Sequence, residues 1–277
     1  MNTTHGDVIL QISLNEKKIG IEDGLTLALL VQRHKPGADV VILNGFPAPL
    51  DTVLREGDAV FLIQRGEQPD EEELEYLLAS RHTPGVHARL KQAVVGIAGV
   101  GGLGSAAAVA LARVGIGRLV IADFDVVEPS NLNRQQFFVD QIGLFKVDAL
   151  ADNLRRINPY VAVDTHRVVL GLDNIPAIFS SCTILVEAFD RADMKAMLVD
   201  AVMECMPGVT VVAASGMAGY GANNAIVTRR IGDRLFLVGD GVSEASPGNG
   251  LMAPRVGIAA SHQANQVVRI ILGEEEL

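Results

Sequence analysis

The sequence predicts an α/β protein in which a small α+β domain precedes a doubly wound, mostly parallel sheet. Its 277 residues are enough for about two domains. From residue 93 onward, apolar strand patterns alternate with helical ones. A glycine-rich stretch at residues 99–104 follows the first of those strands and opens a helix, which is the context in which such a loop approaches a phosphate group.

The N-terminal part has the pattern of several strands around one helix. Four short runs rich in Val, Ile and Leu are expected to be strands, at residues 8–14, 17–22, 40–43 and 59–63. Asn15 and Glu16 separate the first two runs and form a weaker hairpin signal than Asn-Gly. Leu25, Leu29 and Leu30 have helical spacing between the second and third runs.

An acidic segment separates this part from the rest of the chain. Five acidic residues lie within residues 70–75, after Pro69 and ahead of three leucines. Acidic residues in a first turn are typical of the N-terminus of an amphipathic helix, and a charge run of this kind is more often a solvated face than a binding site. We expect a first domain of residues 1–66, an acidic helical linker of residues 67–92 and a second domain of residues 93–277.

The remaining elements alternate along the chain. Strands are expected at residues 93–98, 118–122, 161–166, 183–186 and 209–214, and helices at residues 102–114, 143–157, 173–179, 191–206 and 254–272. Residues 225–230 and 234–238 indicate a β-ribbon before the last helix.

The composition argues against several classes of function. With 33 acidic and 23 basic residues, the formal charge is −10, so the long-range field repels nucleic acid and anionic membrane surfaces, and neither is an expected partner. Residues 1–10 lack the pattern of a secretory signal. Cys182 and Cys205 are too few for a disulfide framework, so we expect a cytoplasmic location and two small core hydrophobes.

The candidate site begins at the glycine loop and continues to the next strand end. The loop consists of Gly99, Val100, Gly101, Gly102, Leu103 and Gly104. Asp123 ends the second strand of this part, where a carboxylate can accept hydrogen bonds from ribose hydroxyl groups. These features alone fit an NAD-dependent dehydrogenase equally well.

Further polar residues follow at positions that a nicotinamide enzyme does not require. Asn131 and Arg134 lie just past the nucleotide-facing strand end, and Lys146 opens the next predicted helix. Asp190 follows the strand at residues 183–186, at the carboxyl edge where open α/β sheets bind ligands. Taken singly, Arg134 could pair with Glu128, Lys146 could extend to solvent and Asp190 could cap a helix.

Residues 93–273 resemble the ThiF/MoeB/HesA family of adenylating enzymes, which are relatives of the ubiquitin-activating enzymes. The resemblance rests on the residues named above and on the stretch Met-Ala-Pro-Arg-Val-Gly at residues 252–257. The size and the absence of Cys-x-x-Cys pairs resemble the thiamine-associated ThiF branch. Residues 1–66 resemble ThiS/MoaD-like β-grasp sulfur carriers, through Leu14-Asn15, residues 40–45 and residues 56–58. The resemblance implies a Rossmann-like fold for the second domain.

The resemblance also implies roles for individual residues. The nucleotide ligands that it implies are the glycine loop, Asp123, Asp125, Asn131, Arg134 and Lys146. Asp190 is expected to hold magnesium, and no zinc is expected because paired Cys-x-x-Cys motifs are missing. Arg134, Lys146, Asp190 and a basic residue from the partner of a homodimer, Arg81 or Arg89, are the expected catalytic groups.

The implied reaction is ATP- and magnesium-dependent adenylylation of the C-terminal glycine carboxylate of a small ubiquitin-like sulfur carrier ending in Gly-Gly, in thiamine thiazole or related sulfur-transfer biosynthesis. The alternatives are adenylation of another substrate, as in tRNA-modifying dehydratase relatives, an NAD-dependent dehydrogenase and a non-catalytic scaffold. The first domain has no free carboxylate at Gly66, because the chain continues. It is therefore expected to dock, regulate or stabilise, or to be a fusion without mechanistic consequence.

Overall fold

The chain forms two compact units, Met1–Pro84 and Gly85–Leu277, in the computed structural model. The structure describes residues 9–82 and 85–274, and for Arg81 it describes the backbone only. Each unit has its own hydrophobic core, so each is described by itself.

The first unit is a five-stranded sheet, in the order β2-β1-β5-β3-β4, that packs against one helix. Its elements are β1 (Ile9–Leu14), β2 (Lys17–Glu22), α1 (Leu27–His34), β3 (Val40–Leu43), β4 (Phe46–Pro47), β5 (Ala59–Ile63) and α2 (Glu71–Arg81). β1 pairs with β5 in parallel and with β2 in antiparallel orientation. Leu27 and Leu30 of α1 are fully buried in a cluster with Ile12, Val60 and Leu62 of the sheet. The predicted α+β fold of this unit is confirmed.

The turn between β1 and β2 is tighter than its sequence suggests. Asn15 and Glu16 both have positive φ, 46° and 68°, which matches the twist of a two-residue hairpin. The conformation is unfavourable for Glu16, but tertiary contacts hold it. The Asn15 amide oxygen accepts a hydrogen bond from Leu62 N at 2.9 Å, and Tyr76 OH donates to Glu16 O at 3.1 Å.

The second unit is the predicted doubly wound sheet, with strand order β11-β12-β10-β9-β6-β7-β8. All neighbours are parallel except β11, which pairs antiparallel with β12. Its strands are β6 (Val94–Ala98), β7 (Arg118–Asp123), β8 (Ala162–Arg167), β9 (Ile184–Glu187), β10 (Thr210–Ala214), β11 (Val227–Gly232) and β12 (Leu235–Gly239). Its helices are α3 (Val86–Gln92), α4 (Gly102–Arg113), α5 (Lys146–Ile157), α6 (Ile175–Ile178), α7 (Ala192–Cys205) and α8 (Ala253–Ile271), with short turns η1 (Pro129–Asn131), η2 (Val139–Gln141) and η3 (Asn223–Ala225).

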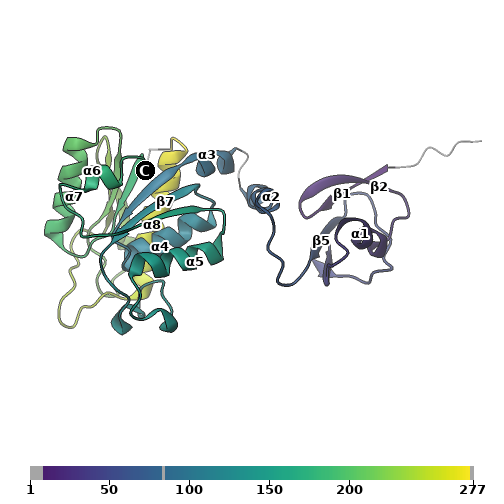
Figure 1. The fold of residues 1–277 in the computed structure, drawn as a ribbon, viewed down its shortest axis with the longest axis horizontal. Helices are drawn as coiled ribbons and strands as arrows, with labels where there is room; N and C mark the ends of the chain where they lie inside the picture. The colour runs from purple at the N-terminus through teal and green to yellow at the C-terminus, as the bar shows by residue number, and fades with distance from the viewer. Residues whose placement is uncertain (1–8, 83–84, 275–277) are drawn as a thin grey trace, which may run out of the picture. The chain divides into compact units, whose positions relative to one another are not determined.

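The helices form a layer on each face of this sheet (Figure 1). α4, α5 and α8 cover one face, and α6 and α7 cover the other. Alternate residues of β9 show the two layers, since Val186 is buried with the first set of helices and Leu185 with the second. The strand order reverses between β6 and β9, so the carboxyl ends of these two strands form the switch point where sheets of this class bind ligands.

The two edge strands of this sheet carry charged side chains. β11 is exposed at Arg229 and Arg230, and its register shifts between Arg230 and Gly232. β8, at the opposite edge, carries Asp164 and Arg167. The central strands β6, β9 and β10, by contrast, are almost entirely buried and uncharged apart from Glu187 at the end of β9.

Several expectations need correction. Cys182 is buried, but Cys205 is exposed and is no core residue, because it ends α7 and no further helical turn covers it. α3 and β4 were not predicted from the sequence, because both are too short to show a periodic pattern. The first residue of the strand expected at residues 8–14 lies outside the described residues. None of the helices within residues 9–82 and 85–274 is long and apolar enough to cross a membrane.

Candidate active site

The glycine loop joins β6 to α4 and packs closely against its surroundings. Gly99 has φ +86°, and a Cβ on it would lie 3.0 Å from Ala188 O. A Cβ on Gly104 would lie 1.9 Å from Gly99 O, so only glycine allows the loop to fold back on the helix. Gly101 is the N-cap of α4 and supplies no capping side chain, so the first backbone N–H groups of this helix are available to an anion.

Asp123 connects this loop to the end of β7. One carboxylate oxygen accepts a hydrogen bond from Val100 N at 2.8 Å, and the other accepts one from Asp125 N at 2.9 Å. A carboxylate has further lone pairs beyond these two bonds. Asp123 can therefore hold the loop and still accept a hydrogen bond from a ligand hydroxyl group.

Lys146 is a buried cation at the start of α5. Its Nζ lies 2.7 Å from Asp125 Oδ2, and its side chain is only 8% exposed. Its backbone N–H also donates to Asp125 O. A buried ammonium group needs a partner of opposite charge, which Asp125 supplies. Lys146 is therefore not an ordinary surface lysine.

Asn131 and Arg134 lie on the turn that follows β7. The Asn131 side chain is buried, and its Oδ1 accepts a hydrogen bond from Glu128 N, so it shapes this turn. Arg134 Nη1 donates to Ser130 O at 3.2 Å and to Asn133 Oδ1. Its side chain lies beside the glycine loop, since a Cβ on Gly102 would lie 3.5 Å from Arg134 Cγ.

Asp190 lies in the loop after β9 and is exposed. It has no hydrogen-bonding or ion-pair partner among the described residues, and it does not cap α7, whose N-cap is Arg191. No group of three or more His, Cys, Asp or Glu side chains capable of holding a metal occurs in the part of the chain that the structure describes. A single free carboxylate suits Mg²⁺, which proteins often bind through one or two carboxylates together with substrate phosphates and water.

The sheet brings most of these residues to one edge. Ala98 of β6 pairs with Ala122 of β7 and with Glu187 of β9, so the segments that follow the three strands start side by side. Arg89 lies elsewhere, because it donates to Leu272 O and Ile271 O at the end of α8. Arg81 ends α2 in the first unit, and its side chain lies outside the described residues.

Glu187, the last residue of β9, lies three residues before Asp190 and forms a buried ion pair. Glu187 is fully buried, and its two carboxylate oxygens lie 2.9 and 3.0 Å from Lys195 Nζ. Burial raises the pKa of Glu187, and the ammonium group of Lys195 opposes that shift. The only sequence signal is an acidic residue at the end of an apolar strand, eight residues before a lysine.

A second buried ion pair joins Arg255 of α8 to Asp240 in the loop after β12, and Arg255 also contacts the loop after β10. Arg255 Nη2 lies 2.7 Å from Asp240 Oδ2, and Arg255 Nη1 donates to Gly221 O. Desolvation raises the pKa of Asp240, but backbone N–H groups of Ser243 and Val242 and the guanidinium group outweigh it and hold that pKa well below its usual range. The pair fixes both loops at the carboxyl edge of the sheet.

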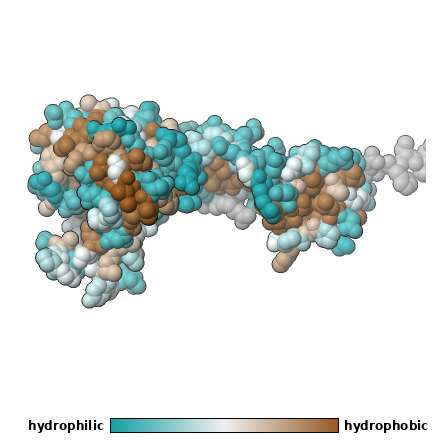
Figure 2. All heavy atoms as spheres, turned by 60° about the horizontal axis from the view of Figure 1, so that its bottom comes forward, coloured by the Kyte–Doolittle hydropathy of each residue, from teal (hydrophilic) through white to brown (hydrophobic). Residues whose placement is uncertain are grey.

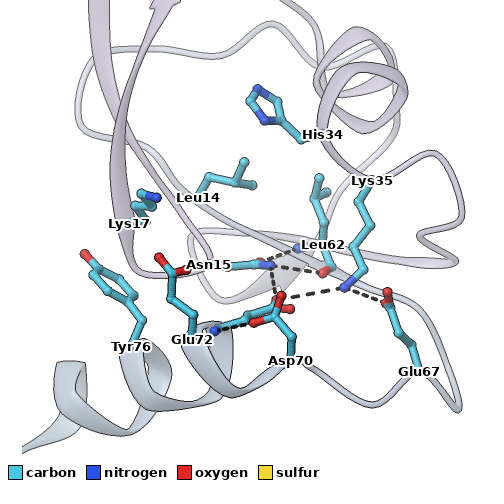
Figure 3. Close-up of a pocket in the computed structure, with 11 residues that line it drawn as sticks. Leu14, Asn15, Lys17, His34, Lys35, Leu62, Glu67, Asp70, Glu72 and Tyr76 are labelled. Atoms are coloured by element: carbon cyan, nitrogen blue, oxygen red, sulfur yellow. Dashed lines mark hydrogen bonds and ion pairs between the residues drawn. The ribbon is translucent and has the colours of Figure 1, made fainter.

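The first unit contains a separate cleft of about 390 Å³ between the β1–β2 turn, the end of α1 and α2 (Figure 3). Lys35 Nζ lies 2.6 Å from Glu67 Oε2 and 3.9 Å from Glu73 Oε1. Asn15 Nδ2 donates to Glu73 Oε1 at 3.3 Å. These contacts bind the segment that follows β5 back onto the first unit.

The fold and the loop define a doubly wound α/β protein with a glycine loop that leaves the N-terminus of α4 uncapped, joined to a small sheet domain. Residues 77–277 match the model of the ThiF family, and residues 10–66 match the model described as ThiS-like ubiquitin. The chain belongs to the ThiF family.

Two curated relatives illustrate the similarity. The "adenylyltransferase and sulfurtransferase UBA4" of Candida glabrata is 32% identical over 192 residues, which cover 67% of this chain and 44% of that protein. The "ubiquitin-like modifier-activating enzyme 5" of Drosophila mojavensis is 40% identical over 118 residues, covering 43% of this chain and 28% of that protein. The chain thus spans less than half the length of these relatives.

Among solved structures, the E. coli tRNA N6-threonylcarbamoyladenosine dehydratase TcdA in complex with AMP has a TM-score of 0.65 at 21% identity, covering 71% of this chain and 93% of that one. The same enzyme in complex with ATP is 22% identical, with a TM-score of 0.65 and the same coverage. At this identity the likeness shows a shared fold.

Proposed function

We propose that the protein adenylylates the C-terminal glycine carboxylate of a small ubiquitin-like carrier protein, with ATP and magnesium. The observation that carries the proposal is the convergence of the glycine loop, Asp123, Lys146 and Asp190 at one edge of the sheet. The names of the two curated relatives, an adenylyltransferase and a ubiquitin-like modifier-activating enzyme, support it.

The reaction needs charge stabilisation rather than a general base. A C-terminal carboxylate has a pKa of about 3.3–3.7 and is already ionised near neutral pH. When it attacks the α-phosphorus of ATP, negative charge develops on the phosphoryl oxygens and on departing pyrophosphate. We assign Lys146 and Arg134 to these charges, and Asp190 to a magnesium ion, which would neutralise the departing pyrophosphate.

The remaining ligand roles follow from position. Asp123 accepts hydrogen bonds from the ribose, and the α4 N-terminus, with Gly101, Gly102 and Leu103, receives a phosphate group. Asp125 is assigned to the nucleotide site through Lys146, because the two side chains form an ion pair in the structure. Asn131 holds the turn that presents Arg134.

The carrier is proposed to be a sulfur carrier that ends in Gly-Gly, and the pathway to be thiamine thiazole or related sulfur-transfer biosynthesis. Residues 93–277 would form the adenylyltransferase domain. Lys35 and Asn15 contact the segment beyond Gly66 and hold it against the first unit, so Gly66 does not end in a free tail. Residues 1–66 would therefore serve docking, regulation or stability rather than act as the carrier. A free tail at Gly66 would require cleavage of the chain.

We further propose a homodimer in which Arg81 reaches the site of the partner subunit. The surface is mixed, with brown apolar areas among the teal ones in Figure 2. The loop after β7 contributes exposed apolar side chains, at Phe124, Val126, Phe138, Val139, Ile142, Leu144 and Phe145. Mixing Arg81→Ala chains with Asp190→Asn chains should restore part of the activity through hybrid dimers, whereas an active monomer in light scattering would contradict this proposal.

The deciding experiment is ATP–pyrophosphate exchange with a panel of small carriers ending in Gly-Gly. Exchange that requires both magnesium and a carrier supports the proposal. Binding of NAD without exchange would favour a dehydrogenase, and nucleotide turnover that responds to tRNA would favour the dehydratase-like alternative. The net charge of −10 argues against an RNA substrate.

A further inference from the structure

We propose that the buried Glu187–Lys195 pair is a positioning device for Asp190, and that it sets how tightly the site binds a divalent cation together with ATP. The inference rests on the proposed function only in taking Asp190 as the cation ligand. It concerns binding, so it can be tested whether or not a carrier protein is known.

The pair closes the loop that carries Asp190. Glu187 is the last residue of β9, and Lys195 lies in the first turn of α7. Both carboxylate oxygens receive a hydrogen bond from Lys195 Nζ, at 2.9 and 3.0 Å. Asp190 lies between the two, so the ion pair joins the strand end to the helix start and limits the positions that the loop can adopt.

The Glu187 carboxylate also fixes the backbone around the loop. Its Oε1 accepts a hydrogen bond from Phe189 N at 2.7 Å, and its Oε2 accepts one from Ala214 N at 3.3 Å. Gln263 of α8 donates to Glu187 O and to Val212 O, at 2.9 and 3.0 Å. β9, β10, α8 and the loop are therefore held at one point.

The same loop packs against the glycine loop. A Cβ on Gly99 would lie 3.0 Å from Ala188 O and 3.2 Å from a ring carbon of Phe189. A shift of the loop would therefore displace both Asp190 and the backbone beside the phosphate site. This contact is the reason to expect that cation and nucleotide affinity change together.

The presence of a charged pair, Glu187 and Lys195, at a position that apolar side chains could fill supports a positioning role. A buried ion pair often adds no stability over apolar side chains of similar size, because removing both charges from water is costly. It does give directional contacts that an apolar pair lacks. Groups that orient a metal ligand commonly change metal affinity or activity about 10- to 100-fold when they are removed.

The test compares Lys195→Met, Lys195→Arg and the double variant Glu187→Gln/Lys195→Met in the full chain. Calorimetry measures the Mg²⁺ dependence of binding of a non-hydrolysable ATP analogue, and hydrogen exchange follows the Phe189 and Ala214 amides. Lys195→Met should weaken apparent Mg²⁺ affinity about 10-fold or more and raise the hydrogen-exchange rates of both amides. Lys195→Arg keeps the positive charge and should retain most of the wild-type affinity. Leu198→Ala, at a fully buried apolar residue of α7, is the control for lost stability alone.

The double variant keeps the test valid if Lys195→Met fails to fold, because it leaves no unpaired buried charge. It should fold and still bind Mg²⁺ weakly. Wild-type Mg²⁺ affinity and amide protection in either variant, with a melting temperature lowered as in Leu198→Ala, would overturn the proposal. A wild type that binds Mg²⁺ and ATP but shows no pyrophosphate exchange with any carrier would overturn the proposed function and leave this inference standing.

Discussion

Gly104 provides the sharpest steric test of the candidate site. In Gly104→Ala, the new Cβ would lie 1.9 Å from Gly99 O, whereas ordinary contact begins at 3.4 Å. The loop and the α4 N-terminus must separate by about 1.5 Å, the difference between the two distances, and a misplacement of about 1 Å costs about 100-fold in activity. Crowding costs about 1–3 kcal/mol of stability, partly offset by the better helix propensity of alanine, about 1 kcal/mol.

The assay is ATP affinity by calorimetry, together with the free energy of unfolding in urea. Gly117→Ala is a matched control, since its Cβ would lie 1.8 Å from Lys91 O, just before β7 at the amino edge of the same sheet. Both variants should be less stable, but only Gly104→Ala should bind ATP more weakly, because only this variant displaces the N–H groups at the start of α4. Unchanged affinity in Gly104→Ala, or an equal loss in Gly117→Ala, would refute the reasoning.

Three further outcomes are expected. Asp190→Asn should lower pyrophosphate exchange about 100-fold or more with little change in melting temperature, and a stability loss with full activity would exclude the metal role. A thiol reagent at pH 8 should modify the exposed Cys205 but not Cys182, because burial raises the pKa of Cys182 to about 11. Rapid modification of both cysteines in the native protein would contradict the burial of Cys182. Asp240→Asn should lower the free energy of unfolding by about 3 kcal/mol at pH 7. Because the folded pKa of Asp240 is depressed, this difference should shrink steadily as pH falls below about 4, and a difference that stays undiminished between pH 4 and pH 2 would show that charge is not its cause.

The second unit was predictable because its central strands are buried on both faces. Such strands appear as continuous apolar runs, and β6, β7, β9 and β10 begin and end within one residue of the expected positions. Asp123 and Asp190 could be placed from sequence because a residue that follows a parallel strand lies at the carboxyl edge of the sheet. Their nucleotide and metal roles stay predictions.

Contacts between distant segments could not be predicted in this way. Glu187 is held by Ala214 and Gln263 as well as by Lys195, and no pattern within β9 indicates partners so far along the chain. The sequence around Lys146 did not indicate that its side chain is buried, because its ion-pair partner Asp125 lies 21 residues away on an irregular segment. The division at residue 66 likewise stays a prediction.

The charged edge strands have a consequence for how copies of this protein can meet. An open sheet can grow by pairing its outermost strand with a strand of another molecule, which leads to aggregation. Arg229 and Arg230 on β11, the irregular register there, and Asp164 and Arg167 on β8 all oppose such growth. In the second unit, pairing of sheets between copies is therefore disfavoured, which leaves its helices and loops as the surfaces through which two copies can meet.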